Sequence, residues 1–300
     1  MNRSLSLAHL ALALVVMAVW GTNFVVIRAA LAHLPPLFMA GLRFLFAFAP
    51  MAFFIRRPAV PWRQLALYGV LIGAGQFGCL FMAMKGGAIS PGLASLVVQT
   101  QVFFTIGLAA ALSGERVRAY QIAALALAAA GLATILVHSG AGATPLGLGL
   151  TLAAALSWAA GNLVSRKATG VNMLAYMVWS SLFAVPPLLI LSLLVEGPAA
   201  IASGVAGADA GTWAAVLWQS VGNTLFGYGV WSWLLARYPA ASVTPLALTV
   251  PVFGMSASAL ILGEPLPAWK LGAAALVLAG LAVNLLWPAI ERRLWRAATA

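Results

Sequence analysis

The chain has 300 residues, of which 63% are hydrophobic and only 7% are charged, and its formal net charge at pH 7 is +11. Because soluble domains carry about 25% charged residues, this composition excludes an ordinary soluble protein. A nucleic-acid-binding face needs clustered Lys and Arg, whereas here the basic residues stand between apolar runs, so we expect no nucleic-acid partner. The lone cysteine, Cys79, lies inside an apolar run and offers neither a disulfide framework nor a thiol metal site.

Successive apolar runs of about 20 residues predict an all-α membrane protein, since about 20 residues at 1.5 Å each cross the hydrocarbon. We predict ten transmembrane helices, at residues 8–30, 36–55, 64–85, 91–112, 118–138, 146–166, 171–194, 213–236, 241–262 and 268–288. The first run is too long for the apolar region of a signal peptide, which has about 7–15 residues, and we predict a mature helix there. Between the seventh and eighth helices, residues 196–212 are rich in Gly and Ala and predict a long external loop.

The distribution of basic residues predicts the orientation. If the N-terminus lies in the cytoplasm, the cytoplasmic segments hold Arg3, Arg56, Arg57, Arg63, Arg116, Arg118, Arg166, Lys167, Arg237, Arg292, Arg293 and Arg296. The outer segments then hold only Arg28, Lys85 and Lys270. Because cytoplasmic loops carry the excess of Lys and Arg, we expect both termini in the cytoplasm.

One stretch of the chain occurs twice. Residues 90–115, SPGLASLVVQTQVFFTIGLAAALSGE, align without a gap with residues 239–264, PAASVTPLALTVPVFGMSASALILGE. Thr100 falls on Thr249, and the match continues into the next helix, where AGLA at 130–133 recurs as AGLA at 279–282. The chain therefore contains a duplicated membrane unit.

The duplication predicts two five-helix repeats at residues 8–138 and 146–288, followed by a basic cytoplasmic tail at 289–300. Five is an odd number, so the second repeat enters the membrane upside down relative to the first. Inverted repeats place a substrate site near mid-membrane between the halves and allow alternating access, which is typical of transporters.

Polar side chains at membrane depth mark the predicted central cavity, because lipid offers them no partner. The candidate hydrogen-bonding residues are Asn23, Gln76, Gln99, Thr100, Gln101, Asn162, Asn223 and Thr249, and the candidate aromatic walls are Trp20, Phe81, Trp158, Tyr228 and Trp231. Helix 8 places Gln219, Asn223 and Trp231 on one face at multiples of four residues. The alternative is that such amides join helices without touching a substrate; helices 5 and 10, built of Ala, Leu, Val and Gly, are expected to be outer scaffolding.

Prolines and one arginine add to this prediction. Pro245 and Pro251 fall inside helix 9 and are expected to kink it, because each removes a backbone hydrogen bond. Pro186 and Pro187 in helix 7 favour a similar bend. Arg43 is expected near the outer face of helix 2, where it either binds a substrate carboxylate or snorkels and pairs with helix carbonyls.

The acidic residues are absent from the membrane interior. All five lie at or beyond predicted helix ends: Glu115, Glu196, Asp209, Glu264 and Glu291. Proton-coupled carriers usually keep a carboxylate or histidine within the membrane, so we expect facilitated transport or exchange. Glu115 and Glu264 each precede a helix start and are expected to be structural, since a carboxylate stabilises the positive end of the helix dipole.

The motifs AVWGTNFVVIRAALAHLPPLFMAGLRF (Ala18–Phe44), GLASLVVQTQVFFTI (Gly92–Ile106), SWAAGNLVSRK (Ser157–Lys167) and the paired Gly-Glu at 114–115 and 263–264 resemble the EamA-type members of the drug/metabolite transporter superfamily. The resemblance covers essentially the whole chain. It is closest to exporters of cysteine and O-acetylserine, with the YddG-type amino-acid exporters also related. It implies two inverted EamA repeats, a bacterial inner-membrane location and export of small metabolites.

These observations together predict an inner-membrane exporter of amino acids or related small metabolites that works by alternating access, without a cofactor or metal. A multidrug or nucleotide-sugar carrier of the same fold and a passive channel remain alternatives. The cavity helices offer few Lys or Arg for the phosphates of a nucleotide sugar, and a channel usually shows charge rings or a filter. An intramembrane enzyme is disfavoured, because no carboxylate pair or His/Cys cluster occurs at membrane depth.

Overall fold

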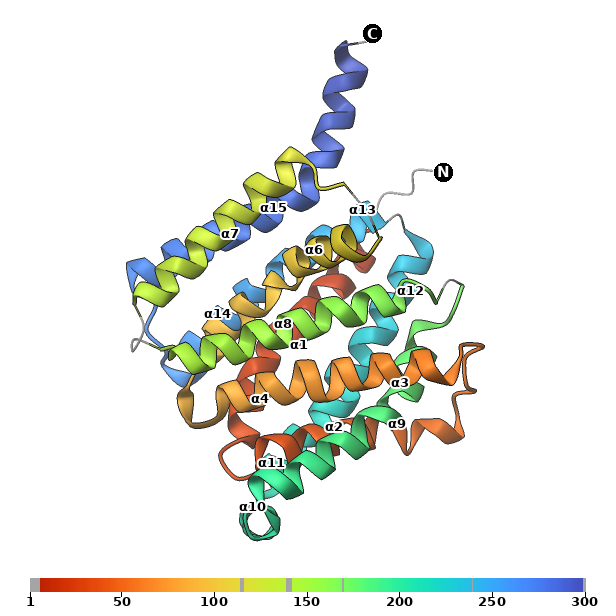
Figure 1. The fold of residues 1–300 in the computed structure, drawn as a ribbon, viewed down its shortest axis with the longest axis vertical. Helices are drawn as coiled ribbons and strands as arrows, with labels where there is room; N and C mark the ends of the chain where they lie inside the picture. The colour runs from red at the N-terminus through yellow and green to blue at the C-terminus, as the bar shows by residue number, and fades with distance from the viewer. Residues whose placement is uncertain (1–5, 114–115, 139–141, 169, 239, 299–300) are drawn as a thin grey trace.

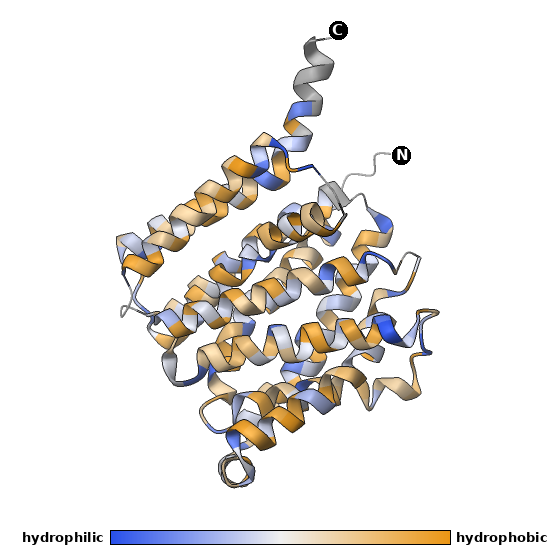
Figure 2. Ribbon diagram, in the orientation of Figure 1, coloured by the Kyte–Doolittle hydropathy of each residue, from blue (hydrophilic) through white to orange (hydrophobic). Residues whose placement is uncertain are grey.

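The computed structural model describes residues 6–113, 116–138, 142–168, 170–238 and 240–298. Within them all regular secondary structure is helical, apart from one isolated bridge between Ile89 and Ala143, and short irregular segments connect the helices (Figure 1). Figure 2 shows that the helices are mostly apolar along their length and that polar residues gather at their ends and in the connections. This is the pattern of a bundle that lies in a bilayer.

The first half of the chain contains five spans. Their elements are α1 (Leu7–Ala30); α2 (Pro36–Phe48) with the 3₁₀ turn η1 (Met51–Phe53); α3 (Trp62–Val70), η2 (Leu71–Gly78), α4 (Cys79–Met84) and the turn η3 (Lys85–Gly87); α5 (Pro91–Val97), η4 (Val98–Thr100) and α6 (Gln101–Ser113); and α7 (Ala119–Val137).

The second half repeats the series. Its elements are α8 (Pro145–Ser165); α9 (Met173–Leu191) with η5 (Ser192–Glu196); α10 (Pro198–Gly207); α11 (Ala210–Leu217), η6 (Trp218–Phe226) and α12 (Gly227–Arg237); α13 (Ala240–Val243), η7 (Thr244–Thr249) and α14 (Val250–Leu262); and α15 (Ala268–Ala298).

Nine helices of the described chain are long and apolar enough to cross a membrane, and a bent pair brings the number to ten. The pair is Pro198–Gly207 with Ala210–Arg237, bent by 107°. Ala210–Arg237 corresponds to the predicted eighth span, and the buried Gln219, Ser220 and Asn223 lower its hydropathy. The membrane class and the ten-helix prediction are therefore confirmed.

Two helix boundaries differ clearly from the prediction. Residues 198–207, expected in a loop, form the helix α10, which begins with Pro198 at its first turn, where the missing N–H costs nothing. Helix α15 continues through Pro288 to Ala298 instead of ending near 288, and Figure 1 shows it projecting beyond the bundle. Helix α9 runs through Pro186 and Pro187 without an interruption.

The packing of the helices shows the inverted pairing of the two halves. Helix α1 packs against α14 of the other half, and α8 packs in the corresponding way against α6. Helices α2 and α9 pack on each other, as do α5 with α14 and α7 with α15. Exchanging the two halves maps these contacts onto one another.

Matching spans also break at matching places. The third span of each half contains a π-helical segment, η2 or η6, and the fourth span contains a 3₁₀ segment, η4 or η7. A break inside a span frees backbone groups that protein or a cavity must satisfy. The breaks therefore place polar backbone near the middle of both halves.

Helices α7 and α15 lie side by side along one edge of the bundle (Figure 1). The duplicated AGLA motif forms this contact: a Cβ on Gly131 would lie 2.9 Å from the Ala273 carbonyl oxygen, and one on Gly280 would lie 2.5 Å from that of Ala124. Only glycine permits such an approach. The expected scaffolding role of these two spans fits their place at the edge.

Candidate functional site

A reciprocal amide pair joins the first and eighth spans inside the bundle. Asn23 of α1 donates from Nδ2 to Gln219 Oε1 at 3.2 Å, and Gln219 of η6 donates from Nε2 to Asn23 Oδ1 at 2.6 Å. Asn23 is 4% exposed and Gln219 is fully buried. Asn23 was predicted as a site residue; Gln219 was recognised on the same helix face as Asn223 but was not among the candidates.

Arg43 of α2 completes this group. Its guanidinium donates from Nη1 to Gln219 Oε1 at 3.0 Å and from Nη2 to Thr224 Oγ1 at 3.1 Å. Its Cζ lies 3.6 Å from the centroid of the Phe77 ring, a cation–π contact. We call Asn23, Arg43, Gln219 and Thr224 the arginine network.

The burial and the partners of Arg43 correct the expectation that it snorkels or pairs with helix carbonyls. Arg43 lies about 10 Å from the Pro36 end of the second span at 1.5 Å per residue. The side chain is 1% exposed and pairs with side chains, not helix carbonyls. The signal available in the sequence was the charge itself inside an apolar run.

A second polar group joins the fourth and sixth spans. Asn162 of α8 donates from Nδ2 to Gln101 Oε1 at 2.8 Å and lies 3.5 Å from Thr105 Oγ1. Thr105 also donates to the Gln101 backbone carbonyl at 2.7 Å. The sequence predicted Gln101 and Asn162 as site residues, and they contact each other directly.

Gln99 connects the breaks of the two halves. Its Nε2 lies 3.4 Å from the backbone carbonyl oxygen of Ala247 in η7 and donates to it. The same carbonyl also accepts the backbone N–H of Val250, whereas Pro251, four residues after Ala247, has no N–H to donate. Pro245 and Pro251 each stand in the first turn of a new segment, η7 and α14, so they divide the ninth span as predicted.

Thr100 and Thr249 hold equivalent positions at the ends of η4 and η7. Thr100 donates its hydroxyl to Val97 O and Thr249 to Leu246 O, both at 2.7 Å. Each hydroxyl is thus bound within its own helix, where it stabilises the tight turn. Their local bonds fit a structural role better than direct contact with a substrate.

Gln76 and Asn223 are both the sixth residue of a π-helical segment, in η2 and η6. Both side chains are buried, and Gln76 Oε1 has no hydrogen-bond partner in the described residues. In each of these segments one backbone carbonyl accepts a hydrogen bond from a side chain of the first or the sixth span. Trp20 donates from Nε1 to Asn223 O at 3.2 Å, and Ser157 donates to Leu71 O at 2.8 Å.

Aromatic rings form a cluster one turn from Asn23 along α1. The Trp20 ring centroid lies 5.5 Å from those of Tyr228 and Trp231. Gly227 makes room for it, since a Cβ there would lie 2.3 Å from Trp20 Nε1. We call Trp20, Tyr228 and Trp231 the aromatic cluster.

Two other predicted aromatic residues lie apart from this cluster. Phe81 is fully buried and packs against Phe77, with ring centroids 5.8 Å apart. Trp158 is half-buried against the main apolar core. Both belong to the packing of the third and sixth spans.

Glu264 ties the end of the ninth span to the fourth. It accepts hydrogen bonds from the hydroxyls of Ser90 and Ser258, from the Gly92 N–H at 3.2 Å and from Lys270 Nζ at 2.8 Å. Burial raises the pKa of its carboxyl, but the bonds from Lys270, Ser258 and Ser90 outweigh it and hold the pKa below the ordinary value. Glu264 thus caps α5, whereas we expected it at the start of the helix that follows it; Glu115 lies outside the described residues.

Glu196 plays a similar part at α2. Its carboxylate accepts from the backbone N–H groups of Leu37 at 2.8 Å and Phe38 at 3.1 Å. Carboxylates at helix N-termini satisfy free N–H groups and the positive end of the dipole. The carboxylates of Glu196 and Glu264 therefore stabilise the starts of α2 and α5.

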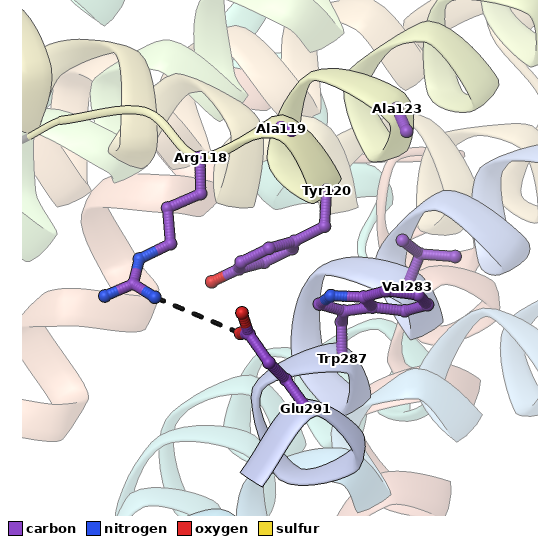
Figure 3. Close-up of a pocket in the computed structure, with 7 residues that line it drawn as sticks. All are labelled: Arg118, Ala119, Tyr120, Ala123, Val283, Trp287 and Glu291. Carbon is purple, nitrogen blue, oxygen red and sulfur yellow. Dashed lines mark ion pairs between the residues drawn. The ribbon is translucent and has the colours of Figure 1, made fainter. Parts of the chain in front are cut away.

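Two pockets lie outside the polar groups. One, of about 410 Å³, lies between the start of α7 and the later part of α15, near Tyr120 and Trp287. The exposed Arg118–Glu291 pair, at 4.0 Å, spans it (Figure 3). The other, of about 460 Å³, lies between α6, α7 and α8 and is apolar except for Thr100. Neither pocket is lined by the amides predicted for a central cavity; Asn23 bonds to Gln219 and Gln101 bonds to Asn162 instead.

Two segments of the chain, residues 7–137 and 145–286, match the model of the EamA-like transporter family. The repeated fold with broken third and fourth spans and this match define a membrane transporter, and the chain belongs to the EamA-like transporter family.

Relatives extend the comparison. The chain is 44% identical to a Salmonella typhimurium protein named "Probable amino-acid metabolite efflux pump", over 91% of this chain and 93% of the relative. It is 41% identical to an Escherichia coli protein of the same name, with the same coverage. A solved crystal structure shares the fold with a TM-score of 0.63 and 19% identity, over 95% of this chain and 97% of the other.

Proposed function

We propose that this protein exports amino acids or closely related small metabolites across a bacterial inner membrane by alternating access. The substrate class is supported by the relatives at 44% and 41% identity, which are named as probable amino-acid metabolite efflux pumps. The inverted pairing of the halves supports the mechanism. The repeats at 8–138 and 146–288 are then the two bodies that move.

One observation carries the proposal: the amide side chains of the predicted site form hydrogen bonds from one half of the chain to the other. Asn23 bonds to Gln219, Gln99 to the Ala247 carbonyl, and Gln101 to Asn162. Each amide can pair with its neighbour when the interface is closed or with a substrate when it opens. Such groups suit the amino and carboxylate groups of a zwitterion, and the aromatic cluster suits its side chain.

The mode of transport that fits the sequence is facilitation or exchange. The described carboxylates, Glu196, Asp209, Glu264 and Glu291, lie at or beyond the ends of spans. Proton relays through membranes use Asp, Glu or His chains. The proposal therefore has the substrate gradient as the driving force.

The basic residues support an orientation with both termini in the cytoplasm. In that orientation α10 and the Glu264–Lys270 pair face outward. A protease cleavage site placed after Ala300 tests this orientation. We expect an added protease to cleave it only after the cells are opened, and cleavage in intact cells contradicts the orientation.

The substrate class is tested by uptake of labelled amino acids into liposomes that contain the purified protein and no ion gradient. We expect saturable uptake of several amino acids. Uptake linear in concentration would favour a channel. If a folded protein takes up no amino acid but carries drugs or nucleotide sugars, the alternative carrier is correct.

A further inference from the structure

Arg43 is a buried cation with unused donors. A guanidinium has five N–H groups, and the bonds to Gln219 and Thr224 use two of them. Its Nε is buried and has no partner in the described residues. One edge of the group is therefore free for a further acceptor.

The described residues also supply no counter-ion. Glu196 binds the start of α2, Asp209 binds Thr212, Glu264 binds Lys270, and Glu291 pairs with Arg118. The partners of Arg43 are a neutral amide and a hydroxyl. Burying an unpaired charge costs several kcal/mol, so a site that keeps one is suited to an anion that arrives from outside the chain.

The neighbours of Arg43 hold the guanidinium in place for such an anion. The Phe77 ring lies 3.6 Å beneath Cζ, and the bonds to Gln219 and Thr224 fix both Nη atoms. Ser220 donates to the Arg43 backbone carbonyl at 3.0 Å, which anchors α2 to η6. A planar group held in this way presents a fixed fork, and a fork matches a carboxylate bidentately.

We propose that Arg43 is the anchor for the α-carboxylate of the transported amino acid, which binds at the Nε edge and supplies the missing counter-ion. Asn23 Oδ1, which accepts one hydrogen bond from Gln219 and has a second lone pair, then accepts from the ammonium group. The aromatic cluster, one helical turn from Asn23 along α1, receives the side chain.

This inference rests on the proposed function and names how its substrate is recognised. Arg43 and Asn23 belong to the first half, and Gln219 and Thr224 belong to the second. Opening of the interface between the halves exposes the anchor, and closure around a bound carboxylate neutralises it. An uncharged carboxamide offers no such neutralisation.

The test compares transport of a labelled amino acid with that of its α-amide in liposomes. The wild-type protein is expected to prefer the acid by roughly 10- to 100-fold in kcat/KM, the value of hydrogen bonds to a charged group. Arg43→Gln is expected to lose that preference. Arg28→Gln is the matched control: Arg28 donates to the Met84 carbonyl at 3.4 Å, away from the network, and its loss should leave the preference intact.

A second variant decides the matter if Arg43→Gln does not fold. Gln219→Glu places a permanent carboxylate beside the guanidinium, so it is expected to raise the melting temperature and abolish the preference for the acid. A Gln219→Glu protein that transports the acid with unchanged preference overturns the proposal, as does a folded Arg43→Gln protein that keeps the preference.

The outcome for the wild-type protein separates the two claims. If it carries neither the acid nor the amide, the proposed function fails. If it carries amino acids with no preference for the acid, the proposed function stands and the role of Arg43 is wrong.

Discussion

Amide side chains at mid-membrane hold the halves together weakly. Interhelical hydrogen bonds in membranes contribute roughly 0.6–2 kcal/mol each, and the bonds of Asn23, Gln99 and Gln101 across the halves are few. An interface of this strength can form and break in each cycle, whereas an interface of buried ion pairs would resist opening. Hydrogen bonds of neutral amides are therefore suited to an interface that opens and closes during transport.

Replacing one of these amides should affect transport more than stability. We expect Gln99→Ala or Gln101→Ala to lower transport several-fold while melting within a few degrees of the wild-type protein, because each loses about 1 kcal/mol or less. Gln121→Ala is the control, since the Gln121 side chain caps the Arg118 N–H in an exposed position. A variant that unfolds, with transport per folded molecule unchanged, would show that the residue only packs helices.

The carboxylate of Glu264 should make stability depend on pH. Its pKa in the folded protein lies below the ordinary value of 4.5, so its contribution is complete above that value and is lost as pH falls from there through the folded pKa. We expect Glu264→Gln to cost about 1–3 kcal/mol at neutral pH, and this cost should shrink as the pH falls below about 4.5.

The measurement is thermal melting of both proteins in detergent from neutral pH to about pH 3. Glu291→Gln is the matched control, because its pair with Arg118 is exposed and such pairs contribute little. A Glu264→Gln cost that stays constant over the whole range would contradict this account.

At the scale of helices, the breaks in the third and fourth spans of each half supply the polar backbone of the site. The backbone carbonyls of Leu71, Asn223 and Ala247 each accept a hydrogen bond from a side chain of another span. Helices α7 and α15 have no such break and pack on each other through glycine.

The contact between α7 and α15 should depend on glycine at one position and not at a neighbouring one. In Gly280→Leu the new Cβ would lie 2.5 Å from the Ala124 carbonyl oxygen, so we expect a loss of about 1–3 kcal/mol and a lower melting temperature. Gly272→Leu, on the same helix with open space around its Cβ, should melt as the wild type does. Equal melting of the two variants would contradict the packing described for α15.

The number of spans and their arrangement in two repeats could be predicted from the sequence, because hydropathy and the duplicated stretch are properties of the sequence itself. It also located the break of the ninth span, since Pro245 and Pro251 cause it locally. The matching break at Val98–Thr100 carries no proline and could not be predicted. There the packing of the fourth span against the second half determines the backbone.

Side-chain partners were also beyond sequence reasoning. Helical periodicity assigns a residue to a face but does not say which distant residue meets it, and Asn23 meets Gln219 across 196 positions. Arg43 was expected to snorkel or pair with helix carbonyls, whereas its partners Gln219 and Thr224 lie more than 170 positions away in the sequence. The hydrogen bonds within their own helices that occupy Thr100 and Thr249 depend on local backbone geometry.

For the whole molecule, the symmetry of the halves is the basis of the mechanism. A bundle whose contacts are exchanged by swapping its halves has a second, inverted arrangement of similar energy available to it. Under the proposed function, the free energy for net movement comes from the substrate gradient.

A proton gradient should therefore not drive transport. We expect equal initial rates of amino-acid uptake into liposomes with and without an imposed pH difference, because the described carboxylates lie at or beyond the ends of spans. An acceleration by the pH difference that an ionophore abolishes would contradict this expectation and would require a protonatable group in the path.

The central claim, that the protein is a carrier of amino acids that alternates between two sides, is tested most directly by counterflow. Liposomes loaded with a high concentration of unlabelled amino acid are diluted into a trace of the labelled compound, and the internal label is followed over time. A carrier predicts a transient accumulation of label above the external concentration, absent from protein-free liposomes. A label that rises only to the external concentration would mean a channel, and no entry of label with a folded protein would mean that the substrate class is wrong.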